Sequence, residues 1–127
     1  MNTFTIGGTE FGINLAESTV ELDQTILTLH IRSDEKVFTA LTDDEDSEWS
    51  WALYPPHLYI HGLETKAGQA TLNGDEDADV AIYMMEHNTI LEAEVMLTPG
   101  HGVELSGVVE LMGEEKPFHV RFRQGGA

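Results

Sequence analysis

Apolar and polar residues alternate along the last third of the chain, and this pattern constrains the fold more than any other feature of the sequence. The residues of one parity are apolar in three successive runs: Leu91, Ala93, Val95 and Leu97; Val103, Leu105, Val109 and Leu111; and Phe118, Val120 and Phe122. A period of two with one apolar face is typical of antiparallel strands that have one side in water. With a further strand upstream, we predict a four-strand meander over about residues 80–123.

Turns between these runs predict how the four strands pair. Pro99-Gly100 suits the centre of a type II turn, His87-Asn88 permits a two-residue hairpin, and residues 112–117 ("MGEEKP") form the third connection. Because inward residues should face inward residues, each turn implies one register. The expected opposite pairs are Leu97 with Val103, Ala93 with Gly107, Glu110 with His119, Ser106 with Arg123, Met84 with Leu91, and Val80 with Val95.

The first half of the chain is less regular but contains strand signals of the same kind. We expect strands in "TFTI", "FGINLAES", "TILTLHIR", "EWSWALY" and "HLYIHGL", with Pro55-Pro56 as the bend between the last two. In "TILTLHIR" and "HLYIHGL" one parity is apolar and the other is polar. The apolar set is Leu27, Leu29, Ile31, Leu58 and Ile60, and the polar set is Thr28, His30, Arg32, His57, Tyr59 and His61.

Residues 33–42 are ambiguous between a helix and a strand. Ser33, Asp34 and Glu35 resemble a helix start, whereas Val37, Phe38 and Thr39 favour a strand. Turn signals recur about every eight to twelve residues. We therefore predict a single domain, residues 1–127, that is mainly β: an antiparallel sandwich or a partly closed barrel with at most one short helix.

Acidic residues dominate the charged composition, with 23 Asp and Glu against 6 Lys and Arg and a formal net charge of −17. Most of the excess lies between residues 33 and 79. Such a charge repels nucleic acid and acidic membrane surfaces within a Debye length of ~8 Å, and it accelerates encounters with basic partners. The alternative is that the surplus acid serves only solubility.

Several classes of protein are excluded by what the chain lacks. It has no cysteine, which rules out thiol catalysis, disulfides, thiolate zinc sites and iron–sulfur clusters. No stretch approaches the ~20 apolar residues of a membrane helix, and no basic segment with a following apolar run begins the sequence. We therefore expect a cytoplasmic protein that does not associate with membranes.

Six histidines raise the question of a metal site, but their spacing gives it no support. His57 and His61 lie in a stretch that looks extended, where four residues span about 13 Å, too far for both rings to bind one ion at ~2.1 Å. Residues 75–86 partly resemble a calcium-binding EF-hand loop, but Val80 stands where that loop needs glycine, and no helices flank it. We expect neither a metal nor a cofactor.

Catalytic motifs are also missing. The sequence has no G-x-S-x-G nucleophile elbow and no phosphate-binding glycine loop with its lysine. Glu92 and Glu94 lie on the solvated side of a predicted strand, where a carboxylate is a poor general acid. We expect a protein that is not an enzyme.

The stretch "TDDEDSEWSW", residues 42–51, joins an acidic turn to two tryptophans. One interpretation places both indole rings in the core. The other leaves one ring partly exposed beside the acids, because an aromatic anchor within a negative rim is a way to bind a basic protein. The expected contact residues are Asp43, Asp44, Glu45, Asp46, Glu48, Trp49, Trp51, Tyr54, His57, Tyr59 and His61.

These observations favour an acidic, non-enzymatic protein that inhibits or neutralises a basic protein partner. It would be of the immunity-protein or inhibitor type, with a nuclease toxin or effector as the target class. A second interpretation is a small β-barrel that binds an apolar small molecule in its interior, lined by Trp49, Trp51, Tyr83 and Met84. A third is a homodimer or a subunit of an assembly, because Val108 and Met112 interrupt a polar strand face.

Overall fold

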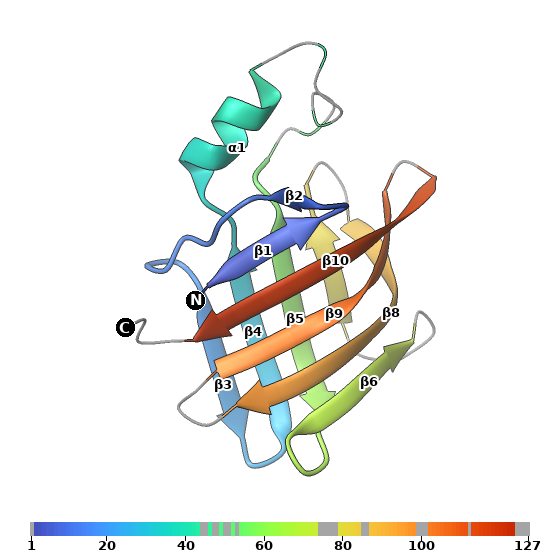
Figure 1. Ribbon diagram of the computed structural model, residues 1–127. Helices are drawn as coiled ribbons and strands as arrows, with labels where there is room; N and C mark the ends of the chain where they lie inside the picture. The colour runs from blue at the N-terminus through green and yellow to red at the C-terminus, as the bar shows by residue number, and fades with distance from the viewer. Residues whose placement is uncertain are drawn as a thin grey trace.

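Two antiparallel sheets lie face to face in the computed structural model, and one long strand belongs to both (Figure 1). The structure describes residues 2–43, 46, 49, 52, 54–73, 79–84, 87–98, 102–111 and 113–123. The strands are β1 (Thr3–Ile6), β2 (Thr9–Glu10), β3 (Thr19–Asp23), β4 (Ile26–Arg32), β5 (His57–Glu64), β6 (Gln69–Asn73), β7 (Asp79–Tyr83), β8 (His87–Thr98), β9 (Gly102–Leu111) and β10 (Glu114–Arg123). Within this part of the chain one helix is present, α1 (Glu35–Thr42). The predicted mainly β sandwich with one short helix is confirmed, and the described strands do not close into a barrel.

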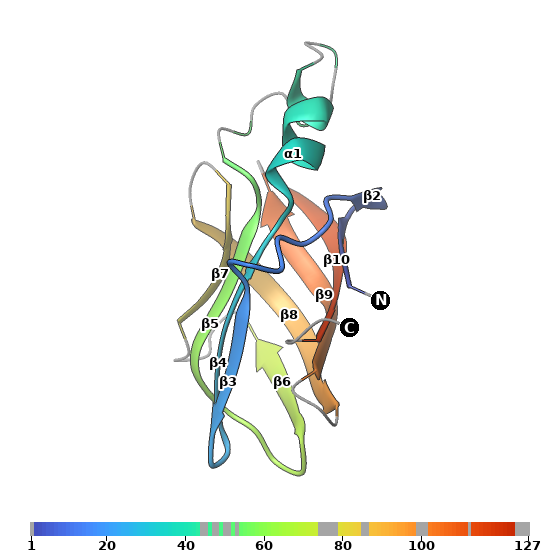
Figure 2. The same cartoon turned by 90° about the vertical axis from the view of Figure 1, so that its left-hand side faces the viewer.

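The strand β8 connects the two sheets. Sheet A contains β2, β1, β10, β9, β8 and β6, and sheet B contains β3, β4, β5, β7 and the first residues of β8. Residues 87–89 pair with β7 and residues 90–98 pair with β9, and the register shifts between Ile90 and Glu92. Figure 2 shows the two layers edge-on, with α1 beyond one end of them. The predicted meander of β7, β8, β9 and β10 is confirmed.

Alternate residues of both sheets point inward and form a single core. The predicted inward residues of β4 and β5 are all buried, and they are Leu27, Leu29, Ile31, Leu58 and Ile60. Sheet A contributes the apolar residues expected from its alternation, among them Val95, Val103, Leu105, Val109, Leu111, Val120 and Phe122. Full burial of one such side chain contributes about 1.5–3 kcal/mol, so this set supplies the main driving force for folding.

The helix α1 begins where the sequence signal places it. The carboxylate of Asp34 accepts hydrogen bonds from the backbone N–H groups of Lys36 and Val37, at 2.8 and 3.3 Å. An aspartate in this position satisfies N–H groups that have no partner within the helix. Phe38 is the buried side chain that attaches the helix to the core. The helical interpretation of residues 33–42 is therefore confirmed.

The predicted register between β8 and β9 is correct, and the turn between β9 and β10 is tighter than expected. Leu97 faces Val103 and Ala93 faces Gly107, as predicted. The pairing of Glu110 with His119 was wrong, as was that of Ser106 with Arg123: in the structure Glu110 faces Glu115 and Ser106 faces His119. The reason is Gly113, whose φ of 81° permits a two-residue turn between Leu111 and Glu114, so that residues 114–117 belong to β10.

The hairpin predicted at His87-Asn88 is also wrong. Tyr83 pairs with His87 and Ala81 pairs with Thr89, so the turn precedes His87, and the pairs Met84–Leu91 and Val80–Val95 do not form. A two-residue hairpin at His87-Asn88 would require a positive φ that histidine tolerates poorly. The side chain of Met84 is fully buried directly after β7.

Two stretches expected to be strands lie in loops. The predicted strand in residues 11–18 is a loop, and Asn14 N–H in it donates to the carbonyl of Arg32 at 2.7 Å. In "EWSWALY", the described residues Trp49, Ala52 and Tyr54 lie outside any strand, and Ala52 N–H donates to the carbonyl of Trp49 at 3.0 Å in a turn. Pro55-Pro56 has no N–H for a ladder, and β5 begins directly after it.

Gly107 provides a direct test of this sandwich. A Cβ built on Gly107 would lie 2.6 Å from Cα and 2.8 Å from Cβ of Ala93, and in contact with the backbone oxygen of Glu92. We expect Gly107→Ala to lower the free energy of unfolding by about 3 kcal/mol or more, because backbone of β8 must shift. The matched control Ser106→Ala changes the exposed neighbour of Gly107. Its free energy of unfolding in urea should stay within about 0.5 kcal/mol of the wild-type value. Equal stabilities of the two variants would contradict the close approach of β8 and β9.

Candidate functional site

Three histidine rings form a hydrogen-bonded chain on the outer face of sheet B. Nδ1 of His30 lies 3.1 Å from Nε2 of His57, and Nε2 of His30 lies 2.9 Å from Nε2 of His61. The ring centroid of Tyr59 lies 5.8 Å from that of His57 and 5.2 Å from that of His61. Four ring-bearing side chains from β4 and β5 thus cover one continuous area.

The pairing of β4 with β5 brings these rings together. His30 faces Tyr59 directly across the two strands, so His57 and His61, two positions to either side of Tyr59, are its diagonal neighbours. His57 and His61 are four residues apart along β5, and each contacts His30. His30 bridges them from the neighbouring strand.

The donor and acceptor roles of the three rings depend on one another. A neutral imidazole has one donor nitrogen and one acceptor nitrogen. Both nitrogens of His30 are engaged. When His57 donates to Nδ1 of a neutral His30, His30 donates from Nε2 to His61. In the opposite arrangement His61 donates to Nε2 of His30, and His30 donates from Nδ1 to His57. An uncharged chain therefore satisfies both nitrogens of the central ring.

Electrostatics favour this uncharged form. Burial lowers the pKa of His57 to about 4, and the charges of Arg32, His30 and His61 act in the same direction. Burial also lowers the pKa of His30, with further lowering by His61 and Arg32 and an opposing contribution from Glu21. Near neutral pH the rings of His30 and His57 are uncharged, and they present flat, polar aromatic surfaces.

The nitrogen atoms of the three rings face one another in pairs. Among the residues that the structure describes, no group of three or more His, Cys, Asp or Glu side chains is placed to hold a metal ion. His30 turns a different nitrogen toward each neighbour, so the nitrogen atoms do not converge on one point. Much of the calcium-loop candidate, residues 75–78, 85 and 86, lies outside the described residues.

Two tyrosines extend the area toward α1. The rings of Tyr54 and Tyr83 stack with centroids 5.8 Å apart and planes 21° apart. Tyr54 N–H donates to the carbonyl of Met84 at 2.8 Å, which ties the segment before β5 to the end of β7. A pocket of about 280 Å³ opens beside these rings and reaches His57. We call the following set the His–Tyr face: His30, Tyr54, His57, Tyr59, His61 and Tyr83.

The structure brings together only part of the predicted contact set. Tyr54, His57, Tyr59 and His61 belong to the His–Tyr face. Asp43 and Asp46 are exposed just after α1, and Trp49 is buried. The remaining predicted contact residues, Asp44, Glu45, Glu48 and Trp51, lie outside the described residues.

Trp49 belongs to the core and is not an exposed anchor. Its side chain is 2% exposed, and its ring meets that of Phe11 edge-on at 5.0 Å. Its Nε1–H donates to Oγ1 of Thr9 at 3.2 Å, so the polar atom of the indole is satisfied inside the protein. The interpretation that places this indole in the core is the correct one for Trp49.

Sequence analysis missed three residues of this region as site residues: His30, Arg32 and Tyr83. The alternation in "TILTLHIR" did place His30 and Arg32 on the polar side of their strand. That signal did not indicate which residues of β5 they would face, because β4 and β5 are separated by α1 and a long connection. Tyr83 was considered only as an interior residue, whereas it is partly exposed.

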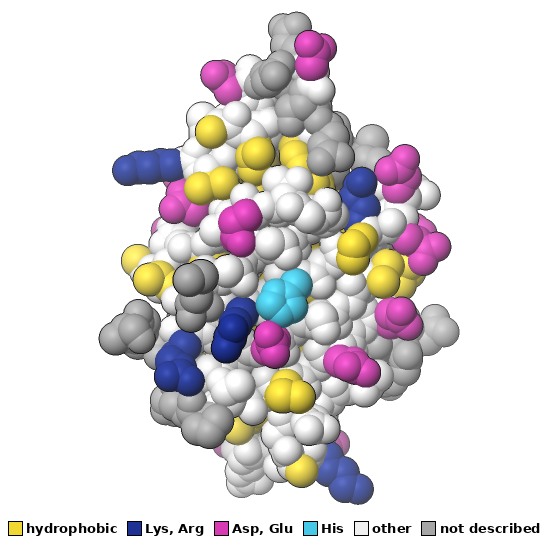
Figure 3. Space-filling view, viewed as in Figure 1, with side chains coloured by type: hydrophobic (Ala, Val, Ile, Leu, Met, Phe, Trp, Pro, Cys, Tyr) yellow, Lys and Arg dark blue, Asp and Glu magenta, His cyan; other side chains and the backbone are white. Residues whose placement is uncertain are grey.

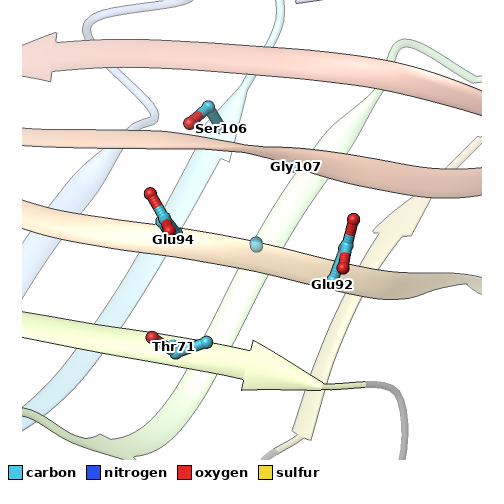
Figure 4. Close-up of a pocket in the computed structure, with 6 residues that line it drawn as sticks. Thr71, Glu92, Glu94, Ser106 and Gly107 are labelled. Atoms are coloured by element: carbon cyan, nitrogen blue, oxygen red, sulfur yellow. The ribbon is translucent and has the colours of Figure 1, made fainter.

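The outer face of sheet A has a different character. Figure 3 shows acidic and basic side chains interspersed on it. Arg121 and Arg123 are exposed residues of β10. Nε2 of His119 lies 3.0 Å from a carboxylate oxygen of Glu104. A hollow of about 250 Å³ lies over Gly107 and is lined by Thr71, Glu92, Ala93, Glu94, Ser106 and Gly107 (Figure 4).

The space between the sheets is occupied by apolar side chains. Met84, one of the residues proposed to line an interior ligand site, is fully buried in the same cluster as Trp49. The two pockets at sheet B and sheet A open to the surface and have polar side chains in their walls. Val108, which suggested an assembly, is partly buried, and Met112 lies outside the described residues.

Comparison with known proteins gave no match. No protein-family model matches the chain, and no curated protein or solved structure is significantly similar to it. In the described part of the chain, no helix is long and apolar enough to cross a membrane. Function must therefore be argued from the residues themselves.

The lowered pKa of His57 predicts an acid-sensitive fold. Between about pH 6.5 and pH 4 the unfolded chain takes up protons that folded His57 and His30 do not, so the free energy of unfolding falls as the pH falls through this window. Because His57 is only half-buried and solvent screens it, we expect its share to be about 1–2 kcal/mol. In urea unfolding, the free energy of unfolding of His57→Gln should fall less between pH 7 and pH 4.5 than that of the wild type.

A control variant and a direct titration accompany this test. His119→Gln changes a histidine on sheet A and keeps the His57–His30–His61 chain, so it should retain the part of the pH dependence that His57 and His30 supply. NMR titration of the imidazole protons should place the midpoint of His57 near pH 4. A midpoint close to the ordinary value of ~6.5 would refute the buried environment of this ring.

Proposed function

We propose that the protein is a non-catalytic binding protein that captures a basic protein partner on the His–Tyr face and thereby inhibits it. The observation that carries this proposal is the gathering of six ring-bearing side chains on one outer face of an acidic protein with a net charge of −17. A basic enzyme, such as a nuclease toxin or effector, is the class of partner that this combination fits best.

The aromatic groups supply the anchoring part of such an interface. Tyrosine rings give large, rigid contact area at low cost in side-chain entropy and are enriched among the residues that dominate binding energy. Uncharged imidazoles beside them do not repel a cationic partner. The faces of Tyr54 and Tyr59 are also suited to stacking with the guanidinium group of a partner's arginine.

Carboxylates around this area supply the charge complementarity. Glu21 lies on the neighbouring edge strand β3 and is close enough to His30 to influence its pKa. Glu17 and Glu35 line the pocket beside Tyr54, while Arg32 is the basic side chain of the pocket. Acidic groups around an aromatic centre attract a basic protein over several ångströms and orient it before contact.

The choice between the two sheet faces follows from the positions of the basic side chains. The outer face of sheet A carries the exposed Arg121 and Arg123 of β10, which would repel a basic partner. The His–Tyr face has Arg32 at one end, beside the pocket. Carboxylates such as Glu104 and Glu110 would attract the same partner to sheet A, so the gathering of the ring-bearing side chains on sheet B decides the choice.

The test compares two variants with the same change in charge on opposite faces. The partner is first recovered at low salt from an extract of the source organism and identified, and its binding is then measured with purified protein. Glu21→Lys on sheet B should weaken binding at least tenfold, mainly through slower association, whereas Glu110→Lys on sheet A should change it less than about threefold. Equal effects of the two variants would contradict docking on sheet B.

Two further measurements examine the anchoring and steering separately. Tyr59→Ala should weaken binding by about tenfold through faster dissociation, because it removes a central ring of the face. The association rate constant should fall at least tenfold between about 50 and 500 mM salt. A rate that is insensitive to salt would rule out steering by the acidic residues.

A further inference from the structure

The pocket beside Tyr54 has the composition of a small-molecule site in its own right. It lies where five segments of the chain meet, and its volume is about 280 Å³. Ligand pockets for drug-sized molecules range from ~300 to 1,000 Å³, so a pocket of this size suits a smaller ligand. Its lining residues are Asn14, Glu17, Arg32, Ser33, Glu35, Tyr54, Pro55, His57 and Tyr83.

Backbone hydrogen bonds fix the walls of this pocket. Asn14 N–H donates to the carbonyl of Arg32 at 2.7 Å, which joins the loop before β3 to the end of β4. Ser33 N–H donates to the carbonyl of Pro56 at 3.0 Å, which joins the segment before α1 to the start of β5. With the bond from Tyr54 to Met84, these contacts hold the lining segments in place before any ligand arrives.

Two groups of the pocket are suited to a carboxylate. Arg32 is exposed on the pocket wall, and neither of the ion pairs found among the described residues includes it. The hydroxyl of Ser33 is buried, with the residue 3% exposed, and among the residues that the structure describes no hydrogen-bond partner is found for it. A guanidinium group binds a carboxylate through two parallel hydrogen bonds, and a buried hydroxyl without a partner is costly to maintain.

Two other groups of the same pocket are suited to an ammonium group. Glu17 and Glu35 both line it and both are exposed carboxylates. A ligand with only negative charge would be repelled by them and by the field of a protein with net charge −17. A ligand with only positive charge would leave Arg32 without a counter-ion. A zwitterion satisfies both signs and has no net charge for the overall field to act on.

The stacked rings of Tyr54 and Tyr83 indicate the remaining part of the ligand. They form an aromatic border of the pocket, next to the uncharged imidazole of His57. A planar side chain could continue this stack with ring centroids about 4.5–7 Å apart. An aliphatic side chain would gain less from the same wall.

Arg32, Glu17 and Glu35 line one pocket that has an aromatic wall. From this placement we propose that the pocket binds a free α-amino acid with a planar side chain. The carboxylate of the ligand binds Arg32, with Ser33 at the same end of the pocket. The ammonium group faces Glu17 and Glu35, and the side chain lies against Tyr54 and Tyr83. This site goes beyond the proposed capture of a protein partner and does not depend on it.

The experiment uses the purified chain alone with four small probes. L-Phenylalanine is titrated into ¹⁵N-labelled protein and followed by NMR, alongside N-acetyl-L-phenylalanine, L-phenylalaninamide and L-leucine. We expect saturable binding of L-phenylalanine at millimolar concentration or below, with shifts centred on residues 14–17, 32–35 and 54–57. Removal of the ammonium or the carboxylate charge should weaken binding at least about tenfold.

Two variants complete the test. Arg32→Gln should weaken L-phenylalanine binding at least about tenfold, while Arg121→Gln, which removes an arginine from sheet A, should leave it unchanged. If Arg32→Gln fails to fold, Glu17→Gln in the exposed loop tests the ammonium end instead. The proposal is overturned if L-phenylalanine does not bind the folded wild type, if the capped analogues bind equally well, or if the shifts lie on sheet A.

Because no partner protein is present, these outcomes are independent of the docking proposal. Failure of amino-acid binding leaves the salt-dependent capture of a basic protein as it stands. Loss of protein capture in Glu21→Lys, with amino-acid binding retained, would show that protein capture depends on a residue that amino-acid binding does not need.

Discussion

The continuity of β8 through both sheets is the constraint on which the rest of this structure depends. The first residues of this strand pair with β7 and the remainder with β9, and the change of partner coincides with the register shift between Ile90 and Glu92. A bulge of this kind bends a strand and increases its local twist. The bend lets β8 continue from one layer into the other, and one set of apolar side chains fills the space between the layers. It also gives the two layers outer faces that point away from each other, which allows two surfaces of different chemistry.

The difference between these two surfaces arises from strand register and not from composition. Acidic residues occur on both sheets, whereas the ring-bearing polar residues meet on sheet B because His30 falls opposite Tyr59. A shift of one residue between β4 and β5 would turn His30 toward the core and Leu29 toward water, so the buried leucine stabilises the position of the histidine. Packing in the core thus determines the arrangement of polar groups on the surface. Burial beside Arg32 then keeps His57 uncharged, which makes the face compatible with a cationic protein.

Sequence alone predicted the features of this fold that depend on local chemistry. Alternation identified β4, β5, β8, β9 and β10 with most of their inward residues, and Asp34 marked the start of α1. Two kinds of information could not be obtained in this way. Both Gly113 and Pro117 could mark the start of β10 in the sequence, and only the pairing of β10 with β9 shows that the strand begins at Glu114. The meeting of His30 with His57 and His61 depends on the pairing of strands that lie far apart in sequence, for which no local signal exists.

The pairing of β1 with β10 has a consequence for how the chain is made. β10 lies between β1 and β9, and Thr3 faces Arg121 across the ladder. During synthesis β1 therefore has no neighbour on that side until β10 leaves the ribosome. Contacts of such long sequence separation slow folding, because the chain must close a very large loop before they form. Sheet B and the β7–β9 hairpins involve only residues that precede β10, so they can form earlier, while β1 has only the two-residue strand β2 beside it.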